Sequence, residues 1–269
     1  MHSIRRPAWA GSFYPARAET LRAMVEGFLA DAQLDDAEPA PRAIAAPHAG
    51  YVYSGPVAGS AYARLALARG RSRTVWLLGP CHDTVCPRPA APMHDAFATP
   101  LGDLAVELDT VRSLVLEGLA EWSDLAHGTE HSLEVQLPFV QVALGDVRIV
   151  PLLLNVSPPE AAAQIVERAL SDPQAAVVVS TDLSHGLSPA AARERDRATA
   201  ARVERGEPVS PADACGACAL SGLALAARRA ALEIRCVDLR HSGDTAGMME
   251  RVVGYGAFVA TSAEPVATR

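Results

Sequence analysis

The chain has 269 residues, of which 49% are hydrophobic and 20% are charged, and its formal net charge is −7. This is the composition of a globular protein, and a mild acidic excess with no basic run excludes an extended nucleic-acid surface. The sequence contains no lysine, which excludes Schiff-base chemistry and a Walker-type phosphate loop, since both need one.

The five cysteines are an odd number, which argues against a disulfide framework. Residues 1–15 lack the apolar segment of a signal peptide, and no run of about 18 apolar residues predicts a membrane span. We therefore expect a cytoplasmic protein without membrane contact.

Helix-like and strand-like patterns alternate along the chain, with no internal repeat and no linker. In chain order they predict a helix over 21–29, a strand over 42–46, a helix that opens at 54–56, a strand over 74–78, a hairpin or irregular excursion over 97–106, a helix over 132–143, strands over 147–156 and 175–180, helices over 190–205 and 215–229, and strands over 234–239 and 252–260. Apolar strands separated by helices predict a single α/β domain over residues 1–269, with a mostly parallel central sheet and helices on both faces.

Three of the predicted strands run directly into a polar segment that contains histidine. His48 follows the first, His82 follows the second, and His185 lies just beyond the strand over 175–180, after Asp182. Ligands bind parallel sheets outside the carboxyl ends of the strands. Neutral imidazole is the commonest protein metal ligand and also a general base near neutral pH. We therefore expect a functional site at this edge, with His48 and His82 on neighbouring strand ends.

Cys215 stands where the sequence predicts the start of a helix, and both a helix N-terminus and a metal lower the pKa of a thiol. The alternative is a small buried residue. Cys215 and Cys218 also form a C-x-x-C pattern, which is weak evidence for zinc or redox chemistry without a second such pair. Cys81 and Cys86 form a weaker pair beside His82.

A second polar cluster contains Glu130 and His131. This cluster has two interpretations. In the first, it is structural and Ser132 is only the N-cap of the next helix. In the second, Glu130 and His131 reach the same sheet edge as acid–base or orienting groups. Four other histidines stand alone and are expected to be structural: His2, His94, His127 and His241.

Seven short motifs occur in a fixed order through nearly the whole chain. They are Ala10–Tyr14 (AGSFY), Ala46–Tyr51 (APHAGY), Leu78–His82 (LGPCH), Thr99–Gly102 (TPLG), Glu130–Glu134 (EHSLE), Ser180–His185 (STDLSH) and Cys215–Gly216. With these motifs the chain resembles the Memo family, also called AmmeMemoRadiSam system protein B.

The resemblance implies the fold of the type III extradiol ring-cleaving dioxygenases, which hold Fe(II) with two His and one Glu. For the Memo family it implies two His and a Cys instead, at the positions of His48, His82 and Cys215. Asp182 and His185 match further pocket residues of the family. The resemblance also implies bound iron or copper and an oxidase or other redox activity.

Two residues depart from the family pattern. Cys81 replaces the usual Ser or Thr beside His82, which would add a thiol near the metal. Cys218 lies where the family does not usually have a cysteine, so it is not expected to join a metal motif.

A thiolate in place of a carboxylate makes the site softer and favours Cu, Zn or Fe over Mg or Ca. Three protein ligands also leave coordination positions open. We therefore expect a metal-dependent redox enzyme, with Fe(II) first and Cu or Zn as alternatives. His185 would move protons. The groups expected to orient His185 or the substrate are Asp182, Glu130 and His131.

Two other functions compete with this one. One is a metal-free thiol hydrolase or transferase with Cys215 as nucleophile, and the other is a non-catalytic binding or scaffold protein. The ligand would be a small molecule or a peptide. The resemblance implies pathway partners in a radical-SAM protein and an AMMECR-type protein.

Overall fold

The computed structural model describes residues 3–35, 37–247 and 249–262. The strands at the centre of its main sheet are parallel. Four adjacent parallel strands lie in the order β2 (Ala43–Ala46), β9 (Ala175–Ser180), β3 (Thr74–Pro80) and β8 (Arg148–Leu154). β2 and β9 are buried at every residue, as is usual for strands covered on both faces. The carboxyl ends of all four strands therefore meet at one edge of the sheet.

The sheet as a whole is mixed, which refines the prediction of a mostly parallel sheet. The antiparallel or outer strands are β12 (Val252–Ser262) on β2, β11 (Leu232–His241) and β10 (His185–Leu187) on β12, β4 (Ala90–Ala91) on β8, and β7 (Glu121–Trp122) parallel to β4. β11 and β12 are joined only by the short helix α9 (Ser242–Ala246) and its flanking residues. A connection this short favours antiparallel pairing, because a parallel pair needs a longer crossover.

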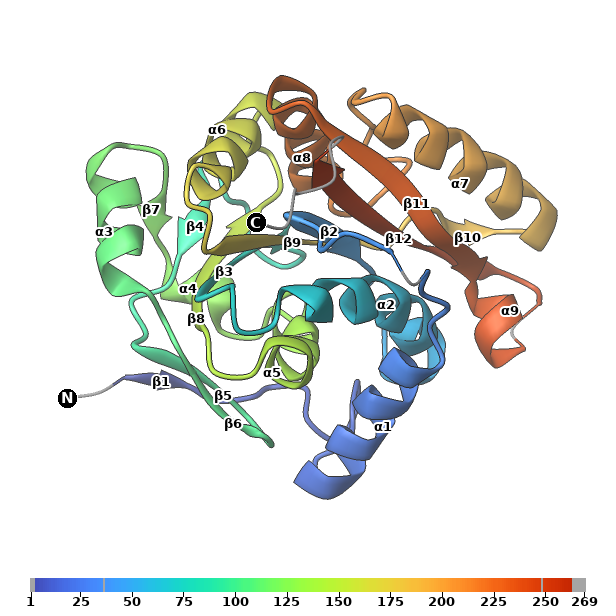
Figure 1. Ribbon diagram of the computed structural model, residues 1–269, viewed down its shortest axis with the longest axis horizontal. Coiled ribbons are helices and arrows are strands. Elements are labelled where there is room, and N and C mark those ends of the chain that lie inside the picture. The colour runs from blue at the N-terminus through green and yellow to red at the C-terminus, as the bar shows by residue number, and fades with distance from the viewer. Residues whose placement is uncertain (1–2, 36, 248, 263–269) are drawn as a thin grey trace.

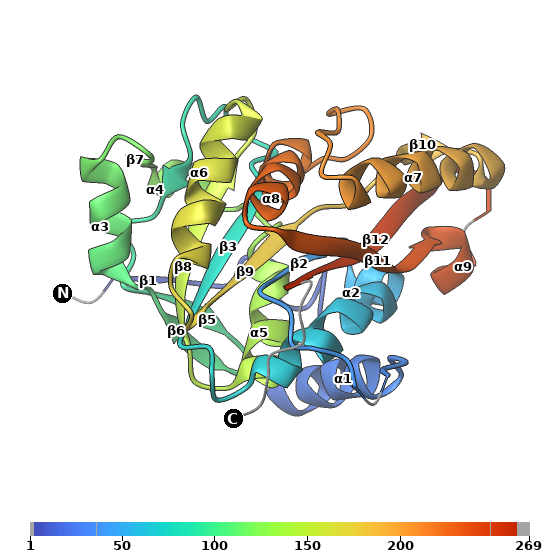
Figure 2. The same cartoon turned by 45° about the horizontal axis from the view of Figure 1, so that its top comes forward.

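Helices cover both faces of the sheet, as predicted (Figures 1 and 2). One face carries α1 (Ala18–Ala30), α2 (Tyr51–Leu65) and α5 (Leu137–Leu144), which pack against one another. The other face carries α6 (Pro159–Leu170), α7 (Pro189–Glu204) and α8 (Ala217–Arg229). The fold is thus a single three-layered α/β domain.

Smaller elements complete the fold at the β8 side of the sheet. The expected hairpin is present as β5 (Ala96–Thr99) and β6 (Gly102–Ala105), with β1 (Ile4–Arg5) paired to β5. The remaining short elements are η1 (Ala66–Ala68), α3 (Leu108–Leu116), α4 (Asp124–His127) and η2 (Glu134–Gln136). Among the described residues, no helix has both the length and the apolar character needed to cross a bilayer.

Two helix starts differ from the prediction. The helix expected to open at 54–56 begins at Tyr51, because the Ser54 amide already donates to the Gly50 carbonyl. Pro56 therefore lies inside α2. Proline has no N–H to donate to the carbonyl four residues earlier, which belongs to the exposed residue Val52. The helix expected over 132–143 is preceded by the 3₁₀ turn η2, and α5 begins only at Leu137.

Candidate metal centre

Three segments that are distant in the sequence meet at the carboxyl edge of the parallel strands. His48 follows β2, His82 follows β3, and Cys215 precedes α8. One ligand atom from each of these residues lies within 4.8 Å of the others. The expectation that His48 and His82 stand on neighbouring strand ends is wrong, because β9 lies between β2 and β3. The end of β9 therefore forms the floor between the two imidazoles.

Cys215 is fastened to this floor by backbone contacts. Its amide donates to the Asp182 carbonyl at 3.2 Å, and the Gly216 amide donates to Thr181 Oγ1 at 2.9 Å. A Cβ at Gly216 would lie 2.7 Å from the Ser180 carbonyl oxygen, so only glycine allows this close approach. The Asp182 amide in turn donates to Cys215 Sγ at 3.2 Å. The sulfur is thereby placed 3.3 Å from His48 Nε2.

The tautomer of His48 follows from its hydrogen-bond network. Ser180 Oγ lies 2.6 Å from the Ser132 carbonyl, which can only accept, so the single hydroxyl proton points there. Gln136 Nε2 donates to the same hydroxyl oxygen and to the Pro47 carbonyl. Ser180 Oγ must then accept from His48 Nδ1 at 2.9 Å. The proton of His48 is on Nδ1, and its Nε2 lone pair is free beside the sulfur.

His82 is held in the same tautomer by Glu130. The carboxylate accepts from the His82 amide at 2.6 Å and from His82 Nδ1 at 2.9 Å. Burial alone would lower the pKa of His82, but the hydrogen bond and charge of Glu130 raise it above its ordinary value. Burial likewise opposes ionisation of Glu130, yet its contacts with His82 bring the pKa of the carboxyl to about 2. A carboxylate that fixes the outer nitrogen of an imidazole is the usual support of a metal-binding histidine.

The electrostatics of the ligand set fit a cation. Burial, followed by the imidazoles of His131 and His82, lowers the pKa of His48 well below 6.5, so the ring is neutral. Burial, followed by the Asp182 carboxylate, raises the pKa of Cys215 to about 12. A neutral imidazole nitrogen and a neutral thiol thus lie 3.3 Å apart, and a cation bound between them would stabilise the thiolate.

A family model described as Memo-like protein matches residues 5–259 of the chain. The chain belongs to the Memo family. A MEMO1 family protein of Methanopyrus kandleri is 32% identical over 278 residues, which cover 95% of this chain and 98% of the relative. A MEMO1 family protein of Archaeoglobus fulgidus is 31% identical over 269 residues, covering 95% and 99%. The family predicted from the motifs is confirmed.

A solved structure shares the fold of this chain. An uncharacterized protein of Escherichia coli K12 aligns with a TM-score of 0.50 at 13% sequence identity, covering 79% of this chain and 98% of that one. At this identity the likeness concerns the fold of the Memo-family chain and not its chemistry.

His131 lies beside both His48 and His82 in this Memo-family chain. Its ring stacks on His82 at 4.6 Å between centroids and stands 5.3 Å from the ring of His48. Its Nδ1 is 3.3 Å from Glu130 Oε1, so that His82, Glu130 and His131 form a second group of close ligand atoms. The rings of Trp9 and Phe13 adjoin His131 and make an apolar wall. Glu130 and His131 thus reach the sheet edge, and Ser132 does not cap α5, because its hydroxyl donates to the Pro80 carbonyl.

Asp182 and His185 each have their own hydrogen-bond partner. Asp182 Oδ1 accepts from the His48 amide at 2.8 Å, and burial raises the pKa of this carboxyl to about 6. His185 is exposed, and its Nδ1 contacts the Leu183 carbonyl at 2.8 Å. The ring of His185 is therefore oriented by the backbone. The catalytic roles of these residues stay predictions.

A buried ion pair missed by sequence reasoning joins the N-terminal segment to the centre. Arg5 Nη1 lies 2.7 Å from Glu134 Oε2, and Arg5 Nη2 donates to the Glu130 carbonyl. Glu134 also accepts from the amides of residues 8 and 9 and from the Tyr14 hydroxyl. The sequence did not predict roles for Ser180 and Gln136 either. The available signal was that Glu134 and Ser180 lie inside motifs and Gln136 lies just after one, whereas Arg5 lies outside all of them.

The other cysteines lie outside the ligand group. Cys81 Sγ contacts the Ala126 carbonyl at 3.9 Å, and its sulfur is not part of the His48–His82–Cys215 group. Cys218 Sγ lies 3.0 Å from the Ser157 carbonyl.

The solitary histidines have structural contacts. His127 is buried and bonds to the Ala90 carbonyl, His241 caps α9, and His94 pairs with Asp124. His2 lies outside the described residues.

Proposed function

We propose that this chain is a metal-dependent oxidoreductase in which His48, His82 and Cys215 hold one ion, Fe(II) first, with Cu or Zn as alternatives. The observation that carries the proposal is the pair of imidazoles whose Nδ1 atoms are both engaged by fixed acceptors, with the sulfur 3.3 Å from His48 Nε2. His48 is buried and His82 is exposed, and neither needs its ring held in this way for packing alone. The mixed nitrogen and sulfur set favours Fe, Cu or Zn over hard cations.

A bound Fe or Cu ion would supply Lewis acidity and one-electron chemistry at the positions that three protein ligands leave open. Glu130 keeps the His82 ring in place and Ser180 keeps the His48 ring in place, so neither ligand has to reorganise. Asp182 fixes the turn that carries His48 by accepting from its backbone amide.

Proton movement is assigned to the histidines that are not ligands. His185 holds a carbonyl with Nδ1, which leaves Nε2 to accept or release a proton at the exposed rim. His131 is partly buried between the ligand histidines and the Trp9–Phe13 wall. This wall supports a small molecule or peptide side chain with an apolar or aromatic part as substrate.

The decisive experiment is elemental analysis of protein purified without oxygen or chelator. We expect close to one equivalent of iron or copper in the wild type and its loss in His48→Ala. His94→Ala is the matched control, because His94 pairs with Asp124 away from the ligand group. Equal metal content in the wild type and His48→Ala would contradict the proposal. Oxygen uptake with a panel of catechols then tests whether the activity is ring cleavage.

A Cys–His thiol hydrolase is the second candidate, because the same 3.3 Å contact joins a nucleophile and a base. Burial that raises the pKa of Cys215 to about 12 disfavours a free thiolate. This candidate predicts labelling of Cys215 by iodoacetamide that a chelator leaves unchanged, whereas a metal-bound sulfur is protected until the chelator is added.

A scaffold role predicts saturable peptide binding that needs neither metal nor turnover. A cytoplasmic location and a pathway shared with a radical-SAM protein and an AMMECR-type protein belong to the proposal as well. Co-purification of either protein with a tagged chain would support the pathway.

A further inference from the structure

Two cysteines lie in the loop that follows β3, at the edge of the sheet where the proposed metal ligands meet. Cys81 stands between the end of β3 and His82, and Cys86 follows in the same loop. Both have free thiols, and both are buried, with exposed fractions of 5% and 2%. Neither belongs to the group of His48, His82 and Cys215, so the proposed function gives these two thiols no role.

The side chain of Asn155, which directly follows β8, holds the backbones of the two cysteines together. Its Nδ2 donates to the Cys81 carbonyl at 3.0 Å, and its Oδ1 accepts from the Cys86 amide at 2.9 Å. Nδ2 also donates to the Thr84 carbonyl between them at 2.6 Å. Since Oδ1 and Nδ2 belong to one planar amide, the Cys81 carbonyl and the Cys86 amide are side by side, and residues 81–86 form a closed turn.

The two thiols of this turn are also neighbours. Cys86 Sγ lies 3.7 Å from the Thr84 carbonyl, inside the turn. The Cys86 thiol is the largest influence on the pKa of Cys81 and lowers it to about 7, against the effect of burial. The Cys81 thiol is likewise the largest influence on the pKa of Cys86, which it raises. A closed turn with neighbouring sulfur atoms is the arrangement from which a disulfide forms with little movement of the chain.

We propose that Cys81 and Cys86 are a redox pair that reduces a small peroxide and closes to a disulfide. With hydrogen peroxide, the thiolate of one cysteine attacks an oxygen, so that an S–O bond forms, the O–O bond breaks and the leaving hydroxide takes up a proton as water. The thiol of the other cysteine then attacks the sulfenic acid. The S–S bond forms, the S–O bond breaks and a second water leaves, so two electrons have passed from the sulfur atoms to the peroxide.

The burial of both thiols limits the class of oxidant. A disulfide reagent such as glutathione disulfide must bring its own sulfur against the attacking thiolate, and buried thiols do not give it access. Hydrogen peroxide is little larger than water and needs no such opening. The pair also depends on Cys81, which stands where the family pattern has Ser or Thr. It requires no metal ion, so it is independent of the proposed metal centre.

The test is mass spectrometry of the reduced full chain after treatment with hydrogen peroxide and a chelator, followed by alkylation and digestion with trypsin. Peptide 74–112 contains Cys81 and Cys86 and no other cysteine, because trypsin does not cut between Arg88 and Pro89. We expect this peptide to lose two hydrogens and to escape alkylation, and to regain both thiols with dithiothreitol. Glutathione disulfide is expected to leave both thiols free for alkylation.

Three kinds of variant sharpen the result. In Cys81→Ser or Cys86→Ser the remaining thiol is expected to stop at the sulfenic acid in at least one of the two variants, which labelling with dimedone detects. Cys236→Ser is the matched control and should still form the disulfide, because Cys236 lies on β11 with its sulfur 3.6 Å from the Asp238 carbonyl. His48→Ala should form it as well, so a failure of the metal proposal is seen in the metal content and not here.

The decisive measurement is made on the wild type and needs no substitution to fold. The proposal is overturned if both thiols of peptide 74–112 are still alkylated after peroxide treatment. It is also overturned if either cysteine pairs with a different cysteine instead, or if peroxide carries the thiols to sulfinic acid with no disulfide between them.

Discussion

The two ends of the parallel strands differ in how their charged and ligand groups are held. At the carboxyl edge, His48 and Glu130 are buried, and the Nδ1 atoms of His48 and His82 are held by Ser180 and Glu130. At the amino edge, Arg22 and Arg73 are exposed and unengaged among the described residues. Buried groups must satisfy one another, so the first site is built into the fold. The exposed guanidinium groups of Arg22 and Arg73 have no partners to lose, so we expect the free energy of unfolding to depend little on them.

The largest expected effect concerns the Arg5–Glu134 ion pair beside the candidate metal centre. Arg5→Met leaves the Glu134 carboxylate buried without its cation, and we expect a loss of about 3–5 kcal/mol in the free energy of unfolding. Urea denaturation measures it. Arg112→Met is the control, because the Arg112–Asp109 pair is exposed and 3.4 Å long. A loss below about 1 kcal/mol would show that the N-terminal segment is not held by this pair.

A pH-dependent difference is expected next, from His127. Burial is the main cause that lowers the pKa of this histidine to about 4, while the unfolded chain has the ordinary value of about 6.5. The neutral ring therefore contributes stability in full above pH 6.5, and this contribution is lost as the pH falls toward 4. The loss amounts to about 3 kcal/mol.

The measurement is the unfolding free energy of the wild type minus that of His127→Gln, followed from pH 8 to pH 4. Taking the difference cancels the titration of all other groups. It should be constant between pH 7 and pH 8 and decrease below pH 6.5. A difference that stays flat down to pH 4 would mean that His127 is protonated without cost in the folded chain.

The positioning of the proposed metal ligands is tested by Glu130→Gln. The amide cannot accept from both the backbone and Nδ1 of His82 as the carboxylate does, so we expect the metal affinity to fall 10- to 100-fold. Competition with a chelator of known affinity measures it. Glu117→Gln, an exposed residue on the β8 side, serves as control. An unchanged affinity would show that Glu130 does not position His82.

The sequence predicts what depends on local pattern. Runs such as Ala175–Ser180 are fully apolar or small, so the predicted and observed strands coincide. The motif residues His48, His82 and Cys215 converge because parallel strand ends must share an edge. The order of the strands in the sheet cannot be predicted in this way. Nothing local to His48 or His82 indicates that β9 separates β2 from β3. Strand order is decided by the packing of the whole domain.

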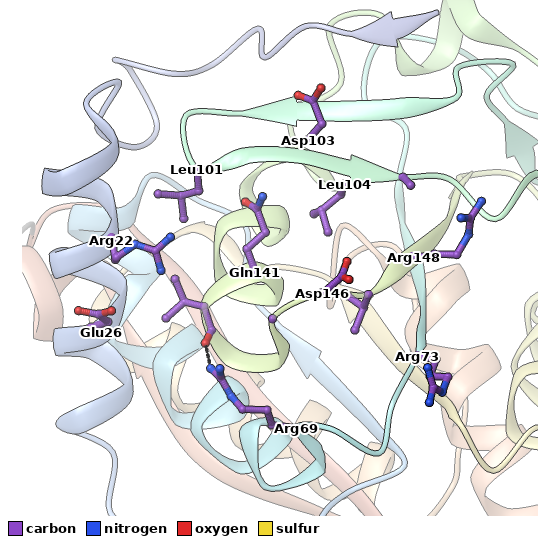
Figure 3. A pocket seen from close by; sticks show the side chains of 14 residues that line it. Arg22, Glu26, Arg69, Arg73, Leu101, Asp103, Leu104, Gln141, Asp146 and Arg148 are labelled. Carbon is purple, nitrogen blue, oxygen red and sulfur yellow. Dashed lines mark hydrogen bonds between the residues drawn. The ribbon is translucent and has the colours of Figure 1, made fainter. Parts of the chain in front are cut away.

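The hydrogen-bond partners of the buried polar groups could not be predicted from the sequence either. Ser180 and Gln136 are ordinary residues in their elements, and only the three-dimensional network shows that they fix the tautomer of His48. The same holds for Arg5 and Glu134, which are 129 residues apart. Arg22 and Arg73 are a further case, because they share no motif and line one cleft from different elements (Figure 3).

The smallest expected effect completes the comparison. Arg22→Gln and Arg73→Gln should change the free energy of unfolding by no more than about 0.5 kcal/mol each, because exposed side chains without partners contribute little to stability. Urea denaturation of each variant measures this. A loss above about 1 kcal/mol would mean that these guanidinium groups hold the fold together, and the two ends of the sheet would no longer differ in kind.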